Sequence, residues 1–133
     1  MMEHALRSAV TDWLRADTEL ASKLNAVTEE GPVASPPPSL TIVASAAADW
    51  SSKTTSGREV RLALELQDRS DTGDATGELA RRIEQRIATL DPAQSGFRII
   101  VTQFLRSRVE RRARSIRAVL LEYRFRLLDL PTE

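Results

Sequence analysis

The sequence predicts one α+β domain over residues 1–133, built on a mostly antiparallel four-stranded sheet with helices packed on one face, in the order α-α-β-β-α-β-β. Three observations predict this fold class. The chain has 133 residues, the usual size of one domain with one hydrophobic core. Residues 58–68 and 119–127 alternate apolar and polar side chains with the period of a strand. Residues 3–16 and 74–90 place apolar side chains at helical spacing.

The N-terminal third predicts two helices followed by an irregular segment. The apolar stripe of the first helix, residues 3–16, consists of Leu6, Val10, Trp13 and Leu14. Asp17 can cap a second short helix that ends at Leu24. Residues 25–39 lose the helical period and include the run Pro36-Pro37-Pro38. Because each proline fixes φ and removes a backbone donor, we expect this segment to be irregular or extended.

Residues 40–67 predict two antiparallel strands joined by a long connection. Residues 40–46 are short, apolar and β-branched, as is typical of a strand. Residues 58–68 form the clearest strand, since four apolar side chains alternate there with polar or small ones. Residues 49–57 lie between them, and their polar side chains suit a turn although the segment is longer than a tight turn requires.

The C-terminal half predicts a helix and then a long hairpin. A helix begins at Asp74 or Thr76 and continues to about Leu90, with its apolar side chains on one stripe. Residues 97–105 predict a third strand and residues 119–127 a fourth. The intervening stretch is almost wholly charged, so we expect it to form the tip of the hairpin.

No catalytic or cofactor-binding constellation is present, so we expect no enzyme, no cofactor and no small-molecule substrate. The chain has no cysteine, and its one histidine, His4, lies near the N-terminus. No glycine-rich phosphate-binding pattern occurs. The aspartates of residues 68–77 lack the closing glutamate of a calcium loop, so no metal site is expected. No apolar run approaches the about 20 residues of a membrane-spanning helix, and the N-terminus lacks a signal-peptide pattern, so we expect no membrane partner.

The charge of the chain is unevenly spread although its net charge is zero. Residues 97–128 hold nine arginines and two glutamates, a balance of +7, which leaves −7 for the remainder. The arginine-rich tip comprises Arg106, Arg108, Arg111, Arg112, Arg114 and Arg117. It can neutralise nucleic acid, pair with an acidic patch on a neighbouring copy, or remain a solvated tip that blocks edge aggregation. We favour pairing between copies, because nucleic-acid binders usually carry net positive charge.

The polar connection supplies a second candidate interface. Trp50 lies there without apolar periodicity around it, either as an interface anchor or folded back over the edge of the sheet. Lys53 and Arg58 flank it as further candidate contacts for a subunit or partner. Trp13, in contrast, lies on the apolar face of the first helix, where core packing is the expectation.

Several stretches resemble a known family. These are "LRAD", "TELASKL", Asp49-Trp50-Ser51-Ser52-Lys53-Thr54 followed by Gly57-Arg58-Glu59, and the closing "FRIIVTQFLRSRVERRARSIRAVLLEYRFRLLD". From about Ala5 to Leu128 the chain resembles the tail-terminator proteins of long-tailed phages and gene transfer agents, also called tail-completion or head-tail joining proteins. The resemblance is one of spacing and elements, with no catalytic signature.

The resemblance implies a structural function. Such proteins form rings, typically homo-hexamers, that cap the tail tube and join the tail to the head. The implied partners are the tail-tube protein and a head-completion protein (connector or stopper), with DNA passing through the ring without sequence-specific binding. The implied location is the bacterial cytoplasm during assembly and then the phage-like particle. The alternative from the residues alone is a small nucleic-acid-binding module that uses the arginine-rich hairpin.

Overall fold

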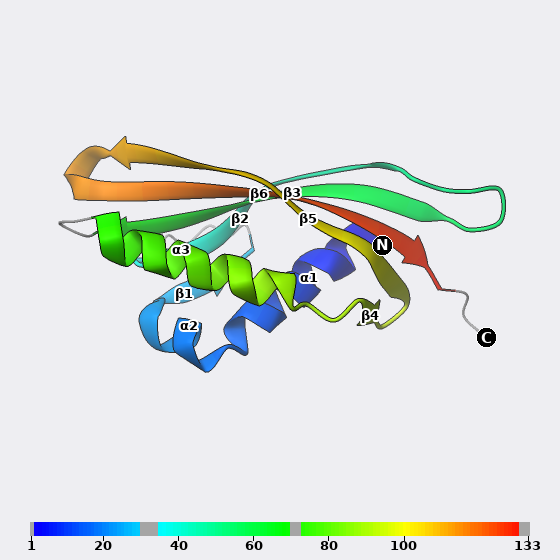
Figure 1. Ribbon diagram of the computed structural model, residues 1–133, viewed down its shortest axis with the longest axis horizontal. Coiled ribbons are helices and arrows are strands. Elements are labelled where there is room, and N and C mark those ends of the chain that lie inside the picture. Colours follow the sequence, from blue (N-terminus) through cyan, green and yellow to red (C-terminus); the bar gives the residue numbers. More distant parts are fainter. Residues whose placement is uncertain (1, 30–34, 70–72, 131–133) are drawn as a thin grey trace.

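The structure, a computed structural model, describes residues 2–29, 35–69 and 73–130. Its helices are α1 (Met2–Arg15), α2 (Thr18–Lys23) and α3 (Gly73–Ala88), with one 3-10 turn, η1 (Ala113–Ser115). Its strands are β1 (Ala26–Thr28), β2 (Ser39–Asp49), β3 (Gly57–Arg69), β4 (Ala93–Gln94), β5 (Phe97–Arg112) and β6 (Ile116–Asp129). Figure 1 shows the three helices together on one side of a strongly twisted sheet.

The strands form one six-stranded sheet in the order β1-β2-β3-β6-β5-β4. The sheet is mixed, because β1 pairs with β2 in parallel whereas the other pairs are antiparallel. The predicted four-stranded, mostly antiparallel sheet in the order α-α-β-β-α-β-β is therefore wrong. The two additional strands have only three and two residues, too few to show the alternation from which strands are recognised in a sequence.

The hydrophobic core lies between the helices and one face of the sheet. Residues paired across β3 and β6, such as Val60 with Phe125 and Leu64 with Leu121, place their apolar side chains on this face. All four are at most 1% exposed. The apolar stripes of α1 and α3 pack against them, represented by Leu6 at 0% exposure. Burial of these facing stripes is what holds the helices to the sheet.

Two long hairpins extend beyond the helical layer at opposite ends of the molecule (Figure 1). One joins β2 to β3 and the other joins β5 to β6. The reason is the rise per residue: the 16 residues of β5 span about 50 Å, whereas the 16 residues of α3 span about 24 Å. A layer of helices this short leaves both ends of the sheet uncovered.

The arginine-rich stretch is mostly strand rather than an extended hairpin tip. β5 continues to Arg112 and β6 begins at Ile116, so only Ala113–Ser115 make the turn. Arg114 and Ser115 have φ values of 62° and 60°, in the left-handed region that a turn this tight requires. Charged residues continue a strand here because one face of it is exposed to solvent and ion pairs lie across it.

Candidate interaction surfaces

The face of the sheet that points away from the helices, here called the outer face, holds three of the six arginines in ion pairs. The pairs are Arg106 with Glu122, Arg108 with Glu110 at 3.0 Å, and Arg112 with Glu65 at 2.5 Å and with Glu110 at 3.3 Å. The hydrogen bond from Arg106 lowers the pKa of Glu122. These arginines are already partnered within the chain, which weakens their case as contacts for another molecule.

The sequence contains a pattern that indicates these ion pairs on one face of a strand. Charged residues at positions 106, 108, 110 and 112 recur with the period of two that places them on one face of a strand. This alternation is hard to recognise because the intervening positions are not all uncharged. Ser107 and Val109 are, but position 111 is an arginine.

The other three arginines concentrate positive charge at the end of the β5–β6 hairpin. Within the described part of the chain, Arg111, Arg114 and Arg117 form no ion pair. Arg111 and Arg117 are paired directly across the two strands, an arrangement in which like charges repel. An anionic partner would relieve this repulsion, so the end of the hairpin is the strongest candidate among the arginines for a contact between molecules.

Trp50 lies at the start of the β2–β3 connection and is half-buried. The Arg126 guanidinium lies 5.4 Å from the centre of its ring, within the range of a cation–π contact. The Trp50 backbone N–H donates to the Gly57 carbonyl at 3.0 Å, which closes the base of the loop. The indole is thus partly held by its own chain and partly available to a partner.

The two basic candidates beside Trp50 differ in their surroundings. Lys53 is exposed in the middle of the connection between β2 and β3. Arg58 forms ion pairs with Glu3 at 3.1 Å and with Asp49 at 3.5 Å. Because Glu3 belongs to α1, Arg58 ties this helix to the sheet, and its charge is already compensated within the chain.

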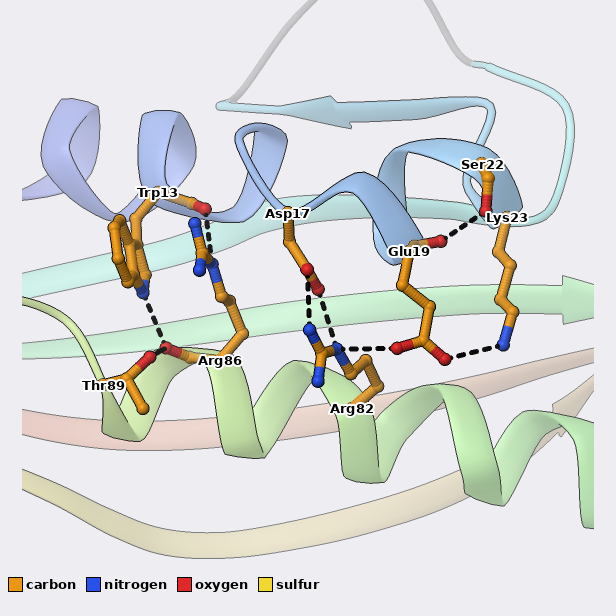
Figure 2. A network of polar contacts seen from close by, with 8 residues as sticks. All are labelled: Trp13, Asp17, Glu19, Ser22, Lys23, Arg82, Arg86 and Thr89. Atoms are coloured by element: carbon orange, nitrogen blue, oxygen red, sulfur yellow. Dashed lines mark hydrogen bonds and ion pairs between the residues drawn. The ribbon is translucent and has the colours of Figure 1, made fainter.

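A polar network between the helices was not predicted from the sequence. Figure 2 shows side chains of α1 and α2 meeting those of α3. The Trp13 indole N–H donates to the Arg86 carbonyl at 2.7 Å, while Arg86 Nε donates to the Trp13 carbonyl at 2.8 Å. The Arg86 guanidinium also lies 3.4 Å from the centre of the Trp13 ring. Trp13 therefore packs at the margin of the core as expected, and it also fastens α1 to α3.

Asp17 forms the centre of this network rather than a helix cap. It occupies the N-cap position of α2, but its side chain makes no capping hydrogen bond. Instead Arg82 donates to both of its carboxylate oxygens, at 2.8 Å and 2.7 Å. Such a two-point contact suits the planar guanidinium. A residue 65 positions away is not visible as a partner in the sequence, because only the packing of the helices brings the two together.

Across residues 2–29, 35–69 and 73–130, no group of three or more His, Cys, Asp or Glu side chains could hold a metal ion. Among the helices that the structure describes, none is long and apolar enough to cross a membrane. The candidate interaction surfaces of the described residues are the ends of the two hairpins and the edges of the sheet.

The model of one protein family, the tail completion protein gp17, matches residues 8–128. The chain belongs to this family. The predicted resemblance is thereby confirmed, and this tail completion protein has a structural role in a phage tail and in virion assembly. A search of curated proteins found no match.

A solved structure supports the fold of the tail completion protein. The protein is similar to a chain in the solved structure of the virion of a native gene transfer agent particle, with 24% sequence identity and a TM-score of 0.82. The similarity covers 94% of this chain and 96% of that chain. The tail completion protein therefore shares its fold over most of its length with a chain of an assembled particle.

The Asp17–Arg82 contact makes the stability of the tail completion protein depend on pH. The hydrogen bond from Arg82 lowers the pKa of Asp17 below its ordinary value of 3.8. A carboxylate whose pKa is lower in the folded state stabilises the fold above its unfolded pKa, and this stabilisation disappears as the pH falls through the folded pKa.

We therefore expect Asp17→Asn to lower the melting temperature at neutral pH, by on the order of 5 °C. The difference from the unchanged protein should begin to shrink as the pH falls below about 4, where Asp17 binds a proton in the unfolded state, and should disappear once the pH has passed through its lower pKa in the folded state. Thermal unfolding followed by circular dichroism across this range measures it. Asp12→Asn is the control, since Asp12 is exposed and lies 4.0 Å from Arg15. An effect of Asp17→Asn that is constant with pH would contradict the prediction.

Proposed function

We propose that this protein forms a homo-hexameric ring that caps the completed tail tube and joins the tail to the head. The observation that carries the proposal is membership of the tail completion family over residues 8–128. The similar chain from a gene transfer agent virion supports the same assembly context, since that chain belongs to the virion of a native particle. On this proposal the protein assembles in the bacterial cytoplasm and then becomes part of the phage-like particle.

The partners on this proposal are the tail-tube protein and a head-completion protein, a connector or stopper. The two hairpins support contacts on two sides, because they project at opposite ends of the sheet and differ in chemistry (Figure 1). One ends in Arg111, Arg114 and Arg117, and the other carries Trp50 and Lys53. DNA passes through the ring, held by charge and not by base-specific contacts. The protein catalyses no reaction.

The candidate interface residues fall into two groups, those that contact other molecules in this proposal and those that act mainly within the chain. Arg111, Arg114, Arg117, Trp50 and Lys53 are the contacts that we assign to neighbouring subunits or partners. The remaining candidates, Arg58, Arg106, Arg108 and Arg112, act first within the chain through their ion pairs. They would contribute to an interface mainly by the shape and charge of the surface that they stabilise.

The mass of the protein in solution tests the ring directly. Native mass spectrometry or light scattering should give six times the 14.8 kDa mass of the chain, either for the protein alone or once its tail-tube partner is added. A monomer at every concentration, with and without the tail-tube protein, would overturn the proposal.

A second candidate function is a nucleic-acid-binding module, which the three arginines at the end of the β5–β6 hairpin favour. It predicts salt-dependent DNA binding by the monomer that disappears in Arg111→Glu/Arg114→Glu/Arg117→Glu. Arg81→Glu is the matched control, since Arg81 is an exposed arginine on α3. DNA binding with this pattern, together with a monomeric mass, would favour the module over the ring.

A further inference from the structure

The sheet leaves long parts of both of its edges open. β1 pairs only with Ser39–Thr41, so residues 43–49 of β2 have no strand beside their free edge among the described residues. β4 pairs only with Phe97 and Arg98, and the Ile99 N–H donates to the Pro92 carbonyl at 2.8 Å. Residues 100–112 of β5 are therefore likewise open within that part of the chain. Each open stretch presents unpaired backbone N–H and C=O groups that can pair with another strand.

The open stretch of β2 lacks the features that usually protect an edge. Native proteins guard edges with charged side chains, proline, very short strands, bulges or a covering helix or loop. Here the sequence Val-Ala-Ser-Ala-Ala-Ala-Asp contains no lysine or proline, and one bulge lies only at its start, between Ile42 and Ala44. Its side chains from Ala44 to Ala48 are small and exposed, and Arg7 of α1 reaches this stretch by donating to the Ser45 hydroxyl at 3.2 Å. The β5 stretch has two such bulges, between Ile99 and Val101 and between Phe104 and Arg106, and carries arginines, so β2 is the less protected of the two edges.

Exposed apolar side chains gather on the same two stretches. Among the residues that the structure describes, five large apolar side chains are exposed, namely Val43 at 37%, Ile100 at 44%, Phe104 at 42%, Val109 at 63% and Leu130 at 42%. Four of them belong to the open stretches of β2 and β5. Open backbone and exposed apolar surface thus coincide, which is typical of a surface that another protein covers.

The two stretches are complementary in charge and in direction. The only charge on the β2 stretch is Asp49, whereas the β5 stretch carries four arginines and one glutamate. Three of these arginines are paired within the chain, so among the described residues Arg111 is the one whose charge is left for a neighbouring Asp49. The strand pairs β2–β3, β3–β6 and β6–β5 are all antiparallel, so β2 and β5 run in opposite directions within one chain. A neighbour that continues the sheet therefore places its β5 antiparallel to β2.

We propose that residues 43–49 of β2 pair with residues 100–112 of β5 in a second copy of this chain, so that the sheet continues from subunit to subunit. The inference rests on the proposed ring and specifies its contact. Because each subunit uses two different edges, the contact is head-to-tail, the kind that a closed ring requires. Phe104 and Val109 would then pack over the small side chains of the neighbouring β2.

Engineered cysteines test this contact, because the natural chain has none. Ser45→Cys or Ala47→Cys on β2 is combined with Thr102→Cys or Ser107→Cys on β5, giving four double variants. Within one chain the two strands are separated by three strand spacings, about 14 Å, which is too far for a disulfide. Any disulfide between β2 and β5 must therefore join two copies.

We expect mild oxidation of at least one double variant to give a ladder of cross-linked species up to the hexamer, while the single variants give none. Gln85→Cys with Ser107→Cys is the control, because Gln85 is exposed on α3, away from either edge. Dimers from single variants without a ladder would indicate edges that pair with themselves and would overturn the head-to-tail contact.

Hydrogen exchange gives a second readout that does not depend on the strand register. Amides in residues 43–49 and 100–112 should exchange more slowly in the ring than in the monomer obtained by dilution. A hexamer in which both stretches exchange as fast as in the monomer, and in which no double variant cross-links, would overturn this contact while leaving the ring intact. The absence of any ring would instead overturn the proposed function itself.

Discussion

Replacing Phe125 by alanine is expected to destabilise the protein by about 4 kcal/mol, the typical cost of removing a buried phenylalanine side chain. Phe125 is 0% exposed and lies on the core face of β6, opposite Val60 of β3. Its ring also stacks with that of Tyr123, with the two centres 6.0 Å apart. The loss would remove a large part of the roughly 5–15 kcal/mol that stabilises a domain of this kind.

Unfolding in urea, followed by circular dichroism, measures this change. Val109→Ala is the matched control, because Val109 is an apolar residue of the neighbouring strand β5 that is 63% exposed. It should change the stability of the monomer by less than about 0.5 kcal/mol. A cost below about 1 kcal/mol for Phe125→Ala would mean that the core does not converge on this side chain.

Gly57→Ala is the second substitution with a large expected effect, a loss of about 3 kcal/mol from overpacking. A Cβ atom at this position would meet the backbone carbonyl of Trp50 and, at 2.9 Å, that of Leu127. Backbone atoms cannot rotate away as the end of a side chain can. The methyl group would therefore push apart β3, β6 and the base of the Trp50 loop.

Gly77→Ala provides the contrast within the same chain. Nothing lies within 4 Å of a Cβ atom built at Gly77, which belongs to α3. Alanine should therefore stabilise the protein there by roughly 0.5–1 kcal/mol, because it favours the helix. Denaturant unfolding of both variants decides the matter, and equal stabilities for Gly57→Ala and Gly77→Ala would refute the close approach at Gly57.

The long helices and strands could be predicted from the sequence because their apolar patterns repeat. The alternation at residues 58–68 lies within β3, and the helical stripe at residues 3–16 lies mostly in α1. The fold class was nevertheless wrong, because β1 and β4 are too short to carry a pattern and are held only by their neighbours in the sheet. That β1 runs parallel to β2 depends on the whole arrangement of the chain and not on any local signal.

The candidate surfaces were predicted less well than the long strands, for a physical reason. Composition locates a run of arginines but does not say which of them find partners after folding. Arg106 and Arg112 do so because the β5–β6 and β3–β6 registers bring Glu122 and Glu65 beside them. The Asp17–Arg82 contact depends in the same way on tertiary packing, so a residue that suits a helix cap became an anchor between helices.

The opposite placement of the two hairpins has a consequence for assembly. In the proposed cyclic ring every copy points the same way. If the strands run along the ring axis, the two ends of each subunit therefore form two different rims, a top and a bottom. One rim would then carry Arg111, Arg114 and Arg117, and the other would carry the Trp50 indole, hydroxyl groups and Lys53. Such a ring has an orientation before it meets either neighbour, and a component added upside down would present the wrong chemistry to both.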